Sequence, residues 1–325
     1  MTRPDTTRLV MKFGGTSMGD LERIRRAARI IAAEAAKGKQ IAVVPGFQGV
    51  SPSGRITTLG RGGSDTSAVA VAAALGCPCD IYTDVDGVYT TDPRIESRAR
   101  RLEKVSYEEM LEMASLGAKV LQTRSVELAM AKQVPLRVLS SFVEPDEDGN
   151  LPANAGTLIC DEENIVEKRI VSGVTVSRDE ARITLLGLAD RTDAPADVFT
   201  RLAEANVNVD MIVQSQARTE GAVNLTFTTG RRDAVRAQDL MTAAKAEIQF
   251  EEIRVDADVA KVSVIGVGMR SHAGVAQTMF KALADKGVKF QAISTSEIKI
   301  SVLIEDAYAE LAVRALHSAY GLDAL

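Results

Sequence analysis

The second half of the chain repeats itself, and this repeat restricts the fold more than any other feature of the sequence. Residues 181–187 are similar to residues 260–266, and Phe199 in the helix that follows corresponds to Phe280. The offset is 79 residues at the glycines (266 minus 187) and 81 at the phenylalanines (280 minus 199), so the second copy carries a two-residue insertion.

Each copy continues with two strands and a helix, which makes two ferredoxin-like βαββαβ units. These elements are expected at 206–210, 223–229 and 233–247 in the first copy, and at 286–290, 299–305 and 307–321 in the second. The pattern alone allows packing modules without a ligand as well as a pair that binds a ligand between its loops.

The first half alternates apolar strands with helices. The strands are expected at 9–13, 41–44, 80–83 and 136–139, and the helices at 21–36, 64–75, 107–117 and 118–132. This alternation predicts an α/β domain with a parallel sheet. The Pro-containing and acidic stretch 144–155 is expected to be a surface loop or linker.

Composition excludes several classes of protein. The net charge is 39 minus 44, or −5, so we expect neither nucleic acid nor a membrane as a partner. Three cysteines, Cys77, Cys79 and Cys160, are too few for a disulfide framework in 325 residues, which favours a reducing cytoplasm. Two histidines, His272 and His317, make no metal site by themselves, and no apolar run is long enough to predict a membrane-spanning helix.

Lys12 and the glycines after it form the first candidate site. The sequence KFGGTS at 12–17 joins the first strand to the first helix. Gly14 and Gly15 let the backbone approach an anion closely, the helix amino terminus offers free N–H groups, and Lys12 adds a positive charge, so a phosphate would fit there. Gly-Gly turns at strand ends are also common for steric reasons, and no Walker A or dinucleotide fingerprint is present.

Two further loops carry polar residues. Residues 57–66 place Arg61 among three glycines, with Ser64 as a helix cap and Asp65 beside it, and a cap alone does not explain the arginine. Residues 82–94 follow another strand and lack the spacing of an EF-hand loop. We expect all three loops at the carboxyl ends of parallel strands, where α/β proteins bind ligands. The inventory fits phosphoryl transfer better than hydrolysis or redox chemistry.

Six motifs follow one another along nearly the whole chain: KFGGTS at 12–17, GFQG at 46–49, TTLGRGGSD at 57–65, YTDVDGVY at 82–89, LGAKVL at 116–121 and STSEI at 294–298. Together they resemble the aspartate kinases of the amino-acid kinase family. The repeated unit is similar to the paired ACT domains of that family. The resemblance implies a shortened kinase domain at 1–165 and ACT domains at 166–249 and 250–325.

The resemblance also implies that ATP phosphorylates the side-chain carboxylate of L-aspartate, giving 4-phospho-L-aspartate, the first step toward lysine, threonine and methionine. Lys12 and Asp65 would be catalytic. The residues that match ATP-binding positions are Lys12, Phe13, Gly14, Gly15, Thr83, Asp84, Tyr89, Arg94, Lys119 and Val120. Those that match aspartate-binding positions are Arg61, Gly62, Gly63 and Ser64. Magnesium (Mg2+) would bridge the phosphates, without a metal site in the protein.

ACT domains of this family bind amino-acid effectors between the two units, which implies feedback by lysine or threonine. The matching positions are Asp190, Asn208, Val209, Asp210, Gln214, Ala273, Gly274, Val275, Thr295 and Ser296. At 190–195 the chain reads DRTDAP and departs from the family's Asp-x-Pro-Gly turn. The family's ACT domains imply a homo-oligomer, and pairing with a second kinase subunit is also implied.

One departure from the family affects the kinase domain. The family has a Ser-Ala-Met segment, a Gly-x-Thr-Asn turn and a Ser-Thr-Gly-Glu turn ahead of its Gly-Phe-Gln-Gly strand. Here residues 37–40 run directly into 41–49, so substrate-gripping residues are missing between about 40 and 41. An internal deletion that joins two similar Val-rich strands would keep one strand in place.

This departure leaves an alternative function open. The chain would then be a catalytically impaired or non-catalytic ACT regulatory protein that binds amino acids and pairs with an intact kinase subunit. A kinase that acts on glutamate or carbamate is a third alternative, against which the paired ACT units argue.

Overall fold

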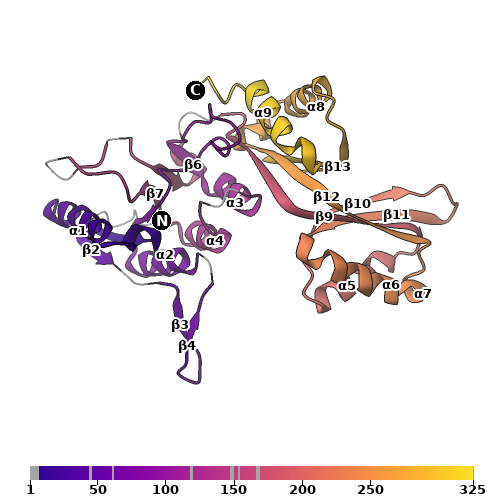
Figure 1. Cartoon of the computed structure of the whole chain (residues 1–325), viewed down its shortest axis with the longest axis horizontal. Helices are drawn as coiled ribbons and strands as arrows, with labels where there is room; N and C mark the ends of the chain where they lie inside the picture. The colour runs from indigo at the N-terminus through magenta and orange to yellow at the C-terminus, as the bar shows by residue number, and fades with distance from the viewer. Residues whose placement is uncertain are drawn as a thin grey trace. The chain divides into compact units, whose positions relative to one another are not determined.

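The computed structural model describes residues 7–43, 46–60, 62–117, 120–146, 150–152, 154–165 and 169–324. The chain forms two compact units (Figure 1). The first consists of Met1–Thr175, Ile265–Ala273 and Tyr320–Leu325, and the second of Val176–Val264 and Gly274–Ala319. The first unit therefore includes two short segments from the last fifth of the chain.

A six-stranded sheet in the order β2-β1-β5-β7-β8-β6 forms the centre of the first unit. Its strands are β1 (Arg8–Phe13), β2 (Gln40–Val43), β5 (Cys79–Thr83), β6 (Lys104–Ser106), β7 (Leu136–Ser140) and β8 (Thr157–Cys160). Strands β2, β1, β5 and β7 are parallel, which confirms the sheet that the alternating pattern predicts. Strand β8 is antiparallel to β7 and β6 is parallel to β8, so the last two strands run in the opposite direction.

Helices cover both faces of this sheet, as a buried parallel sheet requires. They are α1 (Leu21–Ala36), α2 (Gly63–Leu75), α3 (Tyr107–Ser115) and α4 (Thr123–Lys132). Helices α2, α3 and α4 share one buried cluster with Val10, Ile81 and Val138 of the strands. On the opposite face, Ile30 of α1 packs in a cluster with Tyr82. Alternate residues of each strand thus serve opposite faces.

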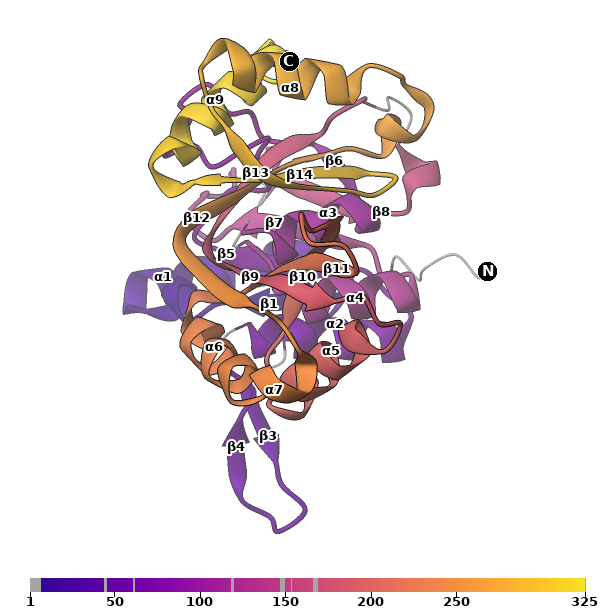
Figure 2. The ribbon, with the colours of Figure 1, turned by 90° about the vertical axis from the view of Figure 1, so that its right-hand side faces the viewer.

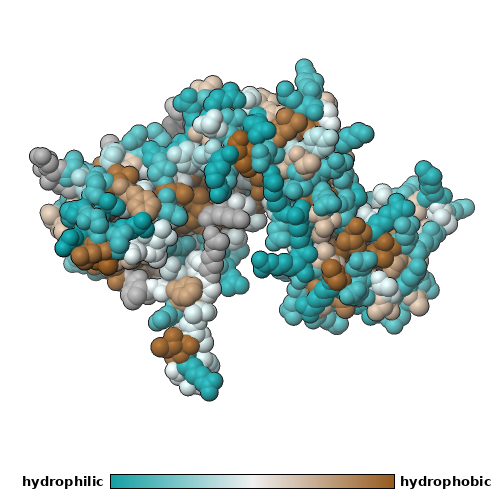
Figure 3. Space-filling model, in the orientation of Figure 1, coloured by the Kyte–Doolittle hydropathy of each residue, from teal (hydrophilic) through white to brown (hydrophobic). Residues whose placement is uncertain are grey.

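A hairpin, which follows β2 and precedes α2 in the chain, projects from the first unit (Figures 1 and 2). Its strands, β3 (Gln48–Val50) and β4 (Ile56–Thr58), form a separate antiparallel sheet. Val50 and Ile56 are 74% and 71% exposed, and Figure 3 shows apolar surface on this projection. The expectation that the loop at 57–66 follows a parallel strand is therefore wrong, because it follows β4 and reaches the sheet through the start of α2.

The two sequence repeats build one continuous sheet in the order β10-β11-β9-β12-β14-β13. Its strands are β9 (Gly173–Ala189), β10 (Val209–Gln216), β11 (Ala222–Thr229), β12 (Glu252–Ile265), β13 (Phe290–Thr295) and β14 (Lys299–Glu305). The long strands β9 and β12 are neighbours at the centre, and each repeat adds a hairpin at one edge. The two edge strands also contact each other, since Met211 of β10 and Ala292 of β13 share a buried cluster.

Helices of the two repeats pack on this second sheet. They are α5 (Ala194–Glu204), α6 (Ala234–Ala243), α7 (Lys245–Ile248), α8 (Val275–Asp285) and α9 (Ala309–Ala319). Helices α5 and α8 pack in part through the equivalent residues Phe199 and Phe280. Phe199 contacts Phe227, and the corresponding Phe280 contacts Phe290, at centroid distances of 5.8 and 5.3 Å. Figure 2 shows α8 and α9 together beside β13 and β14. No helix that the structure describes is long and apolar enough to cross a membrane.

Several predicted element boundaries are wrong for local backbone reasons. Asn206 and Gly287 have positive φ angles of 54° and 68°, so the chain turns there and β10 and β13 begin three or more residues later than expected. Gly117, with φ at 115°, follows the end of α3, and α4 begins later than the helix expected at 118–132. The single helix expected at 233–247 is divided at Ala244 into α6 and α7.

Candidate active site

The carboxyl ends of β1, β5 and β7 bring the KFGGTS turn at 12–17 and the loop at 82–94 together. Gly14 N donates to Tyr82 O over 3.1 Å, and Ser141 N donates to Thr83 O over 2.8 Å. The turn after β1 and the loop after β5 therefore lie side by side at one edge of the sheet. This is the edge at which parallel α/β sheets bind ligands.

The turn after β1 is compact and has one open position. Phe13, at the end of β1, stacks on Tyr82 with ring centroids 4.6 Å apart. A Cβ on Gly14 would lie 3.5 Å from Lys12 Nζ, whereas a Cβ on Gly15 would meet nothing within 4 Å. Gly14 N–H is already engaged by Tyr82 O, so Gly14 is not the backbone donor for a ligand in this turn.

Lys12 and Asp65 form a buried ion pair at this edge. Lys12 lies on β1 and Asp65 in the first turn of α2, and Lys12 Nζ lies 2.6 Å from Asp65 Oδ1. Their side chains are only 10% and 9% exposed, so each charge depends on the other for compensation. The pair is not aligned as a hydrogen bond, because Asp65 Oδ1 has no hydrogen-bond partner among the residues described. An ammonium group has three donors, so Nζ can donate to an anion while its charge compensates Asp65.

Close packing holds the start of α2 against this edge. Gly62 precedes the helix with φ at 73°, and a Cβ there would lie 2.7 Å from Gln122 Cβ. A Cβ on Gly46 would lie 2.5 Å from Ser64 Cα. Side chains at these two glycines would displace the helix that carries Asp65, which explains the glycines of both motifs sterically. The predicted substrate residue Arg61 lies outside the described residues.

Ser17 belongs to the same site, although the sequence analysis did not select it. It lies in the short 3-10 helix η1 (Thr16–Met18), and its side chain is buried. Its Oγ would lie 3.8 Å from a Cβ on Gly14 and has no hydrogen-bond partner in the described part of the chain. A buried hydroxyl without a partner is rare, and a ligand oxygen in this turn would satisfy it. Its position two residues after the paired glycines was the available signal.

The first residues of the loop after β5 continue this edge. Thr83 ends β5, and its Oγ1 donates to Asp84 Oδ1 over 3.1 Å. Val120, between α3 and α4, is partly buried and packs against the core cluster of the first unit. The predicted ATP-binding residue Lys119 lies outside the described residues.

The predicted residues Tyr89 and Arg94 are engaged by acids of their own loop. Tyr89 OH donates to Asp86 Oδ1 over 3.0 Å, and burial raises the pKa of Tyr89, with the Asp86 hydrogen bond adding to the rise. Arg94 is 87% exposed, and its guanidinium pairs with Asp92 at 2.6 Å. The hydrogen bonds and charge of Asp92 raise the pKa of Arg94. Arg94 is therefore exposed to solvent and paired within its own loop.

The effector positions of the first repeat lie on and beside β10. The strand β10 contains Val209, Asp210 and Gln214, and Asn208 directly precedes it. Asp190 lies elsewhere, directly after the end of β9. Val209 is partly buried, and the other four residues are exposed.

Asp210 has a buried cationic partner in β12. Its carboxylate pairs with Lys261 Nζ, which also lies 2.6 Å from Glu180 Oε1. Burial lowers the pKa of Lys261, but the two carboxylates outweigh this effect and raise it.

The effector positions of the second repeat fall in two places. Ala273, Gly274 and Val275 lie at the start of α8, where Gly274 has φ at 95°. Thr295 ends β13, and the N–H of Ser296 donates to a carbonyl in the turn that follows. Because β10 contacts β13, the structure brings together the strands that carry effector positions from both repeats.

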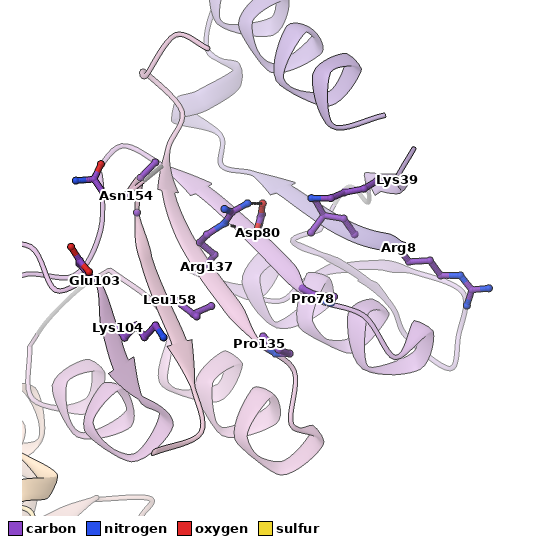
Figure 4. A pocket seen from close by; sticks show the side chains of 13 residues that line it. Arg8, Lys39, Pro78, Asp80, Glu103, Lys104, Pro135, Arg137, Asn154 and Leu158 are labelled. Carbon is purple, nitrogen blue, oxygen red and sulfur yellow. Dashed lines mark hydrogen bonds and ion pairs between the residues drawn. The ribbon is translucent and has the colours of Figure 1, made fainter. Parts of the chain in front are cut away.

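A separate pocket of about 450 Å³ lies at the opposite ends of the strands (Figure 4). Leu9, Pro78 and Pro135 line it where β1, β5 and β7 begin. Arg137 pairs with Asp80 inside it at 2.6 Å. Since it lies at the amino-terminal edge of the parallel strands, this pocket is distinct from the Lys12 site.

Comparison with known families agrees with both parts of the fold. The model of the Amino acid kinase family matches residues 7–46 and 34–140, and an ACT domain model matches 262–320. The two matches to the kinase model overlap at 34–46, so this segment is similar to two places in the family. An internal deletion that joins two similar strands would produce this pattern.

Known relatives cover nearly all of the chain. It is 54% identical to the aspartokinase of Pseudomonas aeruginosa over 291 residues, which cover 89% of this chain and 68% of the relative. The solved structure of E. coli aspartokinase III with aspartate and ADP is 32% identical, has a TM-score of 0.69 and is matched over 92% of this chain and 65% of that chain. The E. coli aspartokinase III structure with lysine and aspartate is 29% identical, with a TM-score of 0.65, and is matched over 97% of this chain and 69% of that chain. The chain belongs to the aspartate kinase family, with a kinase region shorter than that of its relatives.

Proposed function

We propose that this chain transfers a phosphoryl group from ATP to the side-chain carboxylate of L-aspartate, giving 4-phospho-L-aspartate. The observation that carries the proposal is the buried Lys12–Asp65 pair beside the Gly14 turn, in a chain of the aspartate kinase family. Phosphoryl transfer requires positive charge and hydrogen-bond donors around the transferred group, and little covalent work by the protein. Lys12 supplies the charge, while Gly15 N–H and Ser17 Oγ supply donors.

Asp65 is assigned the role of holding Lys12. With Asp65 at 2.6 Å, the ammonium group stays beside the turn instead of moving away to solvent. Bound together with ATP, magnesium would supply further charge neutralisation at the phosphates. We assign the magnesium to the phosphates of the nucleotide rather than to a set of ligands in the protein.

The nucleotide and aspartate sites are proposed around this pair. The nucleotide is assigned to Lys12, Phe13, Gly14, Gly15, Thr83, Asp84, Tyr89, Arg94, Lys119 and Val120. The substrate is assigned to Arg61, Gly62, Gly63 and Ser64. Rotation of Arg94 away from Asp92 is part of this assignment, since the pair is exposed and such pairs contribute little stability.

A second candidate function follows from the missing segment. The family model matches twice across residues 34–46, and the chain spans 68% of its Pseudomonas relative. If the lost residues are needed to hold aspartate, nucleotide binding persists without turnover. The chain then serves as a regulatory protein that binds amino acids and pairs with an intact kinase subunit.

We propose that lysine or threonine binds between the two repeats. The contact of β10 with β13 supports this assignment, as does the lysine named in the structure of E. coli aspartokinase III. Asp210 offers a half-exposed carboxylate to the ammonium group of an amino acid.

The remaining assignments concern assembly and cellular context. The kinase domain is proposed at 1–165, and the ACT domains, through which the chain would form a homo-oligomer, at 166–249 and 250–325. The product would enter lysine, threonine and methionine synthesis. Cys77, Cys79 and Cys160 are buried and not joined in disulfides, which suits a reducing cytoplasm.

Two measurements on the purified chain separate the two functions. Calorimetric titration with ADP tests the nucleotide site, and ADP release from ATP with and without L-aspartate tests turnover. Aspartate-dependent ADP release supports the kinase. ADP binding without any aspartate-dependent release contradicts it and favours the regulatory protein.

A further inference from the structure

Glu109 of α3 is a buried carboxylate that joins three segments of the first unit. Its side chain is 2% exposed. Oε2 accepts from Ser106 N and Oγ at 3.1 and 3.0 Å and so caps α3. Oε1 accepts from Ser172 Oγ at 2.6 Å and from Val267 N at 3.0 Å. One carboxylate thus receives four donors, two of which come from segments 63 and 158 residues away.

The two distant segments are packed tightly against each other. A Cβ on Gly266 would lie 2.3 Å from Ile170 O, and a Cβ on Gly268 would lie 2.3 Å from Arg169 O. Ser172 N also donates to a backbone carbonyl of this segment, at residue 265, over 2.8 Å. Because no space separates the two backbones, a displacement of residues 265–268 must move residues 169–172 or break these contacts.

This junction leads to the proposed nucleotide site by two routes. Along the chain, α3 runs directly into the LGAKVL motif that contains Val120. Across space, Val174 N donates to Thr90 O over 2.8 Å, next to Tyr89. Gly173 packs on α3 itself, since a Cβ there would lie 2.8 Å from Met113 Cε.

The other end of the junction leads to the proposed effector site. Val267 begins the 3-10 helix η4 (Val267–Ser271), and the chain continues into Ala273, Gly274 and Val275. A ligand that reorders residues 273–275 therefore displaces the adjoining η4 segment, in which Val267 N–H donates to Glu109.

We propose that Glu109 is the positioning residue that couples the effector site to the nucleotide site. The inference rests on the proposed function, because it names the regulation of those two sites. Loss of the Val267 or Ser172 bond leaves a buried acceptor or donor unsatisfied, which favours discrete arrangements of the junction over gradual deformation. Effector and nucleotide then change each other's affinity by the same factor.

The test measures the factor by which the effector changes the affinity of the chain for ADP. The dissociation constant of ADP is determined by calorimetry with and without saturating L-lysine, and again with L-threonine, for the wild type and three variants. Glu109→Gln removes the carboxylate charge at the junction. Ser172→Ala removes one donor and leaves the cap of α3 intact, so it serves if Glu109→Gln does not fold. Glu108→Gln is the matched control, since Glu108 precedes Glu109 on α3 and its Oε2 has no hydrogen-bond partner in the part of the chain described.

The wild type and Glu108→Gln are expected to show an effector-dependent change of about fivefold or more in the ADP dissociation constant. In Glu109→Gln this change falls to less than about twofold, and in Ser172→Ala it is reduced, while both ligands still bind each variant alone. The inference is overturned if Glu109→Gln and Ser172→Ala both keep the effector-dependent change of the wild type. It is also overturned if the wild type binds ADP and the effector without either changing the affinity for the other. Absence of ADP binding in the wild type overturns the proposed function itself, and the inference with it.

Discussion

Lys12 Nζ lies 2.6 Å from Asp65 Oδ1, which joins the end of β1 to the first turn of α2. The two residues belong to different sequence motifs, one before and one after the projecting hairpin. Their contact makes one site out of two Gly-rich segments, so the removal of either residue has both a structural and a functional consequence.

Replacement of Lys12 by Met is expected to lower the free energy of unfolding of the first unit by about 3–5 kcal/mol, because Asp65 is left as a buried unpaired charge. Chemical denaturation followed by circular dichroism measures this loss. The double variant Lys12→Met with Asp65→Leu removes both charges and should recover most of the stability, while ADP binding stays weakened. A double variant as unstable as the single one would contradict the account of the pair.

Gly14 and Gly15 form a matched pair of sites for an added methyl group. In Gly14→Ala the new Cβ lies 3.5 Å from Lys12 Nζ, an ordinary contact, so the fold is retained while the methyl occupies space beside the ammonium group. We expect ADP binding to weaken by about tenfold or more in Gly14→Ala, equivalent to about 1.4 kcal/mol, and by less in Gly15→Ala. Calorimetry measures both, and equal affinities for the two variants would argue against a phosphate beside Nζ.

Glu34 stabilises the connection of α1 to β2, where we infer that a segment of the family is missing. Its carboxylate pairs with Lys37 at 2.8 Å and Lys39 at 2.6 Å. Burial raises the pKa of Glu34, but the hydrogen bonds of the two lysines outweigh this effect and hold it below its ordinary value of 4.5. The ion pairs of Glu34 therefore stabilise the fold at pH values above 4.5. This stabilisation is lost as the pH falls through the lowered pKa of the folded state.

Glu34→Gln should accordingly be less stable than the wild type at pH 7, by less than about 1 kcal/mol, and the difference should shrink in acid. Urea denaturation at pH 7 and pH 3 measures it, with Glu22→Gln on the exposed face of α1 as the control. A deficit that is the same at both pH values would rule out the ionised pair as its cause.

Asp210 tests the proposed effector site. Asp210→Asn removes the charge offered to an amino-acid ammonium group, while Lys261 keeps its partner Glu180 at 2.6 Å. Binding of lysine or threonine should weaken by about tenfold or more, as expected for loss of a charge-assisted hydrogen bond. Titration calorimetry checks this. The control is Asp256→Asn, because Asp256 is a different carboxylate, on β12, and pairs with Arg182. Unchanged binding in Asp210→Asn would remove this residue from the effector site.

The sequence patterns predicted the elements that repeat or alternate, because periodic burial depends on local order. The strands at 9–13 and 80–83 and the helix at 64–75 appear within one or two residues of their expected bounds. Strand starts after α5 and α8 were misplaced, because the left-handed turns at Asn206 and Gly287 take up residues that a hydrophobicity pattern assigns to a strand.

Long-range contacts could not be predicted from the sequence in the same way. The Lys12–Asp65 pair depends on where α2 begins, and the four donors at Glu109 depend on segments that only the folded chain brings together. The hairpin of β3 and β4 did have a local signal, since Gly54 lies between two short strands with φ at 78°, and turn chemistry would have identified it.

Trapping of the acyl phosphate gives a direct test of phosphoryl transfer to aspartate. The chain is incubated with ATP, magnesium and L-aspartate in the presence of hydroxylamine, which converts 4-phospho-L-aspartate into a hydroxamate that mass spectrometry detects. The account predicts hydroxamate that requires both ATP and aspartate and disappears in Lys12→Met combined with Asp65→Leu. A folded wild type that binds ADP and yields no more hydroxamate than this variant would contradict the kinase assignment.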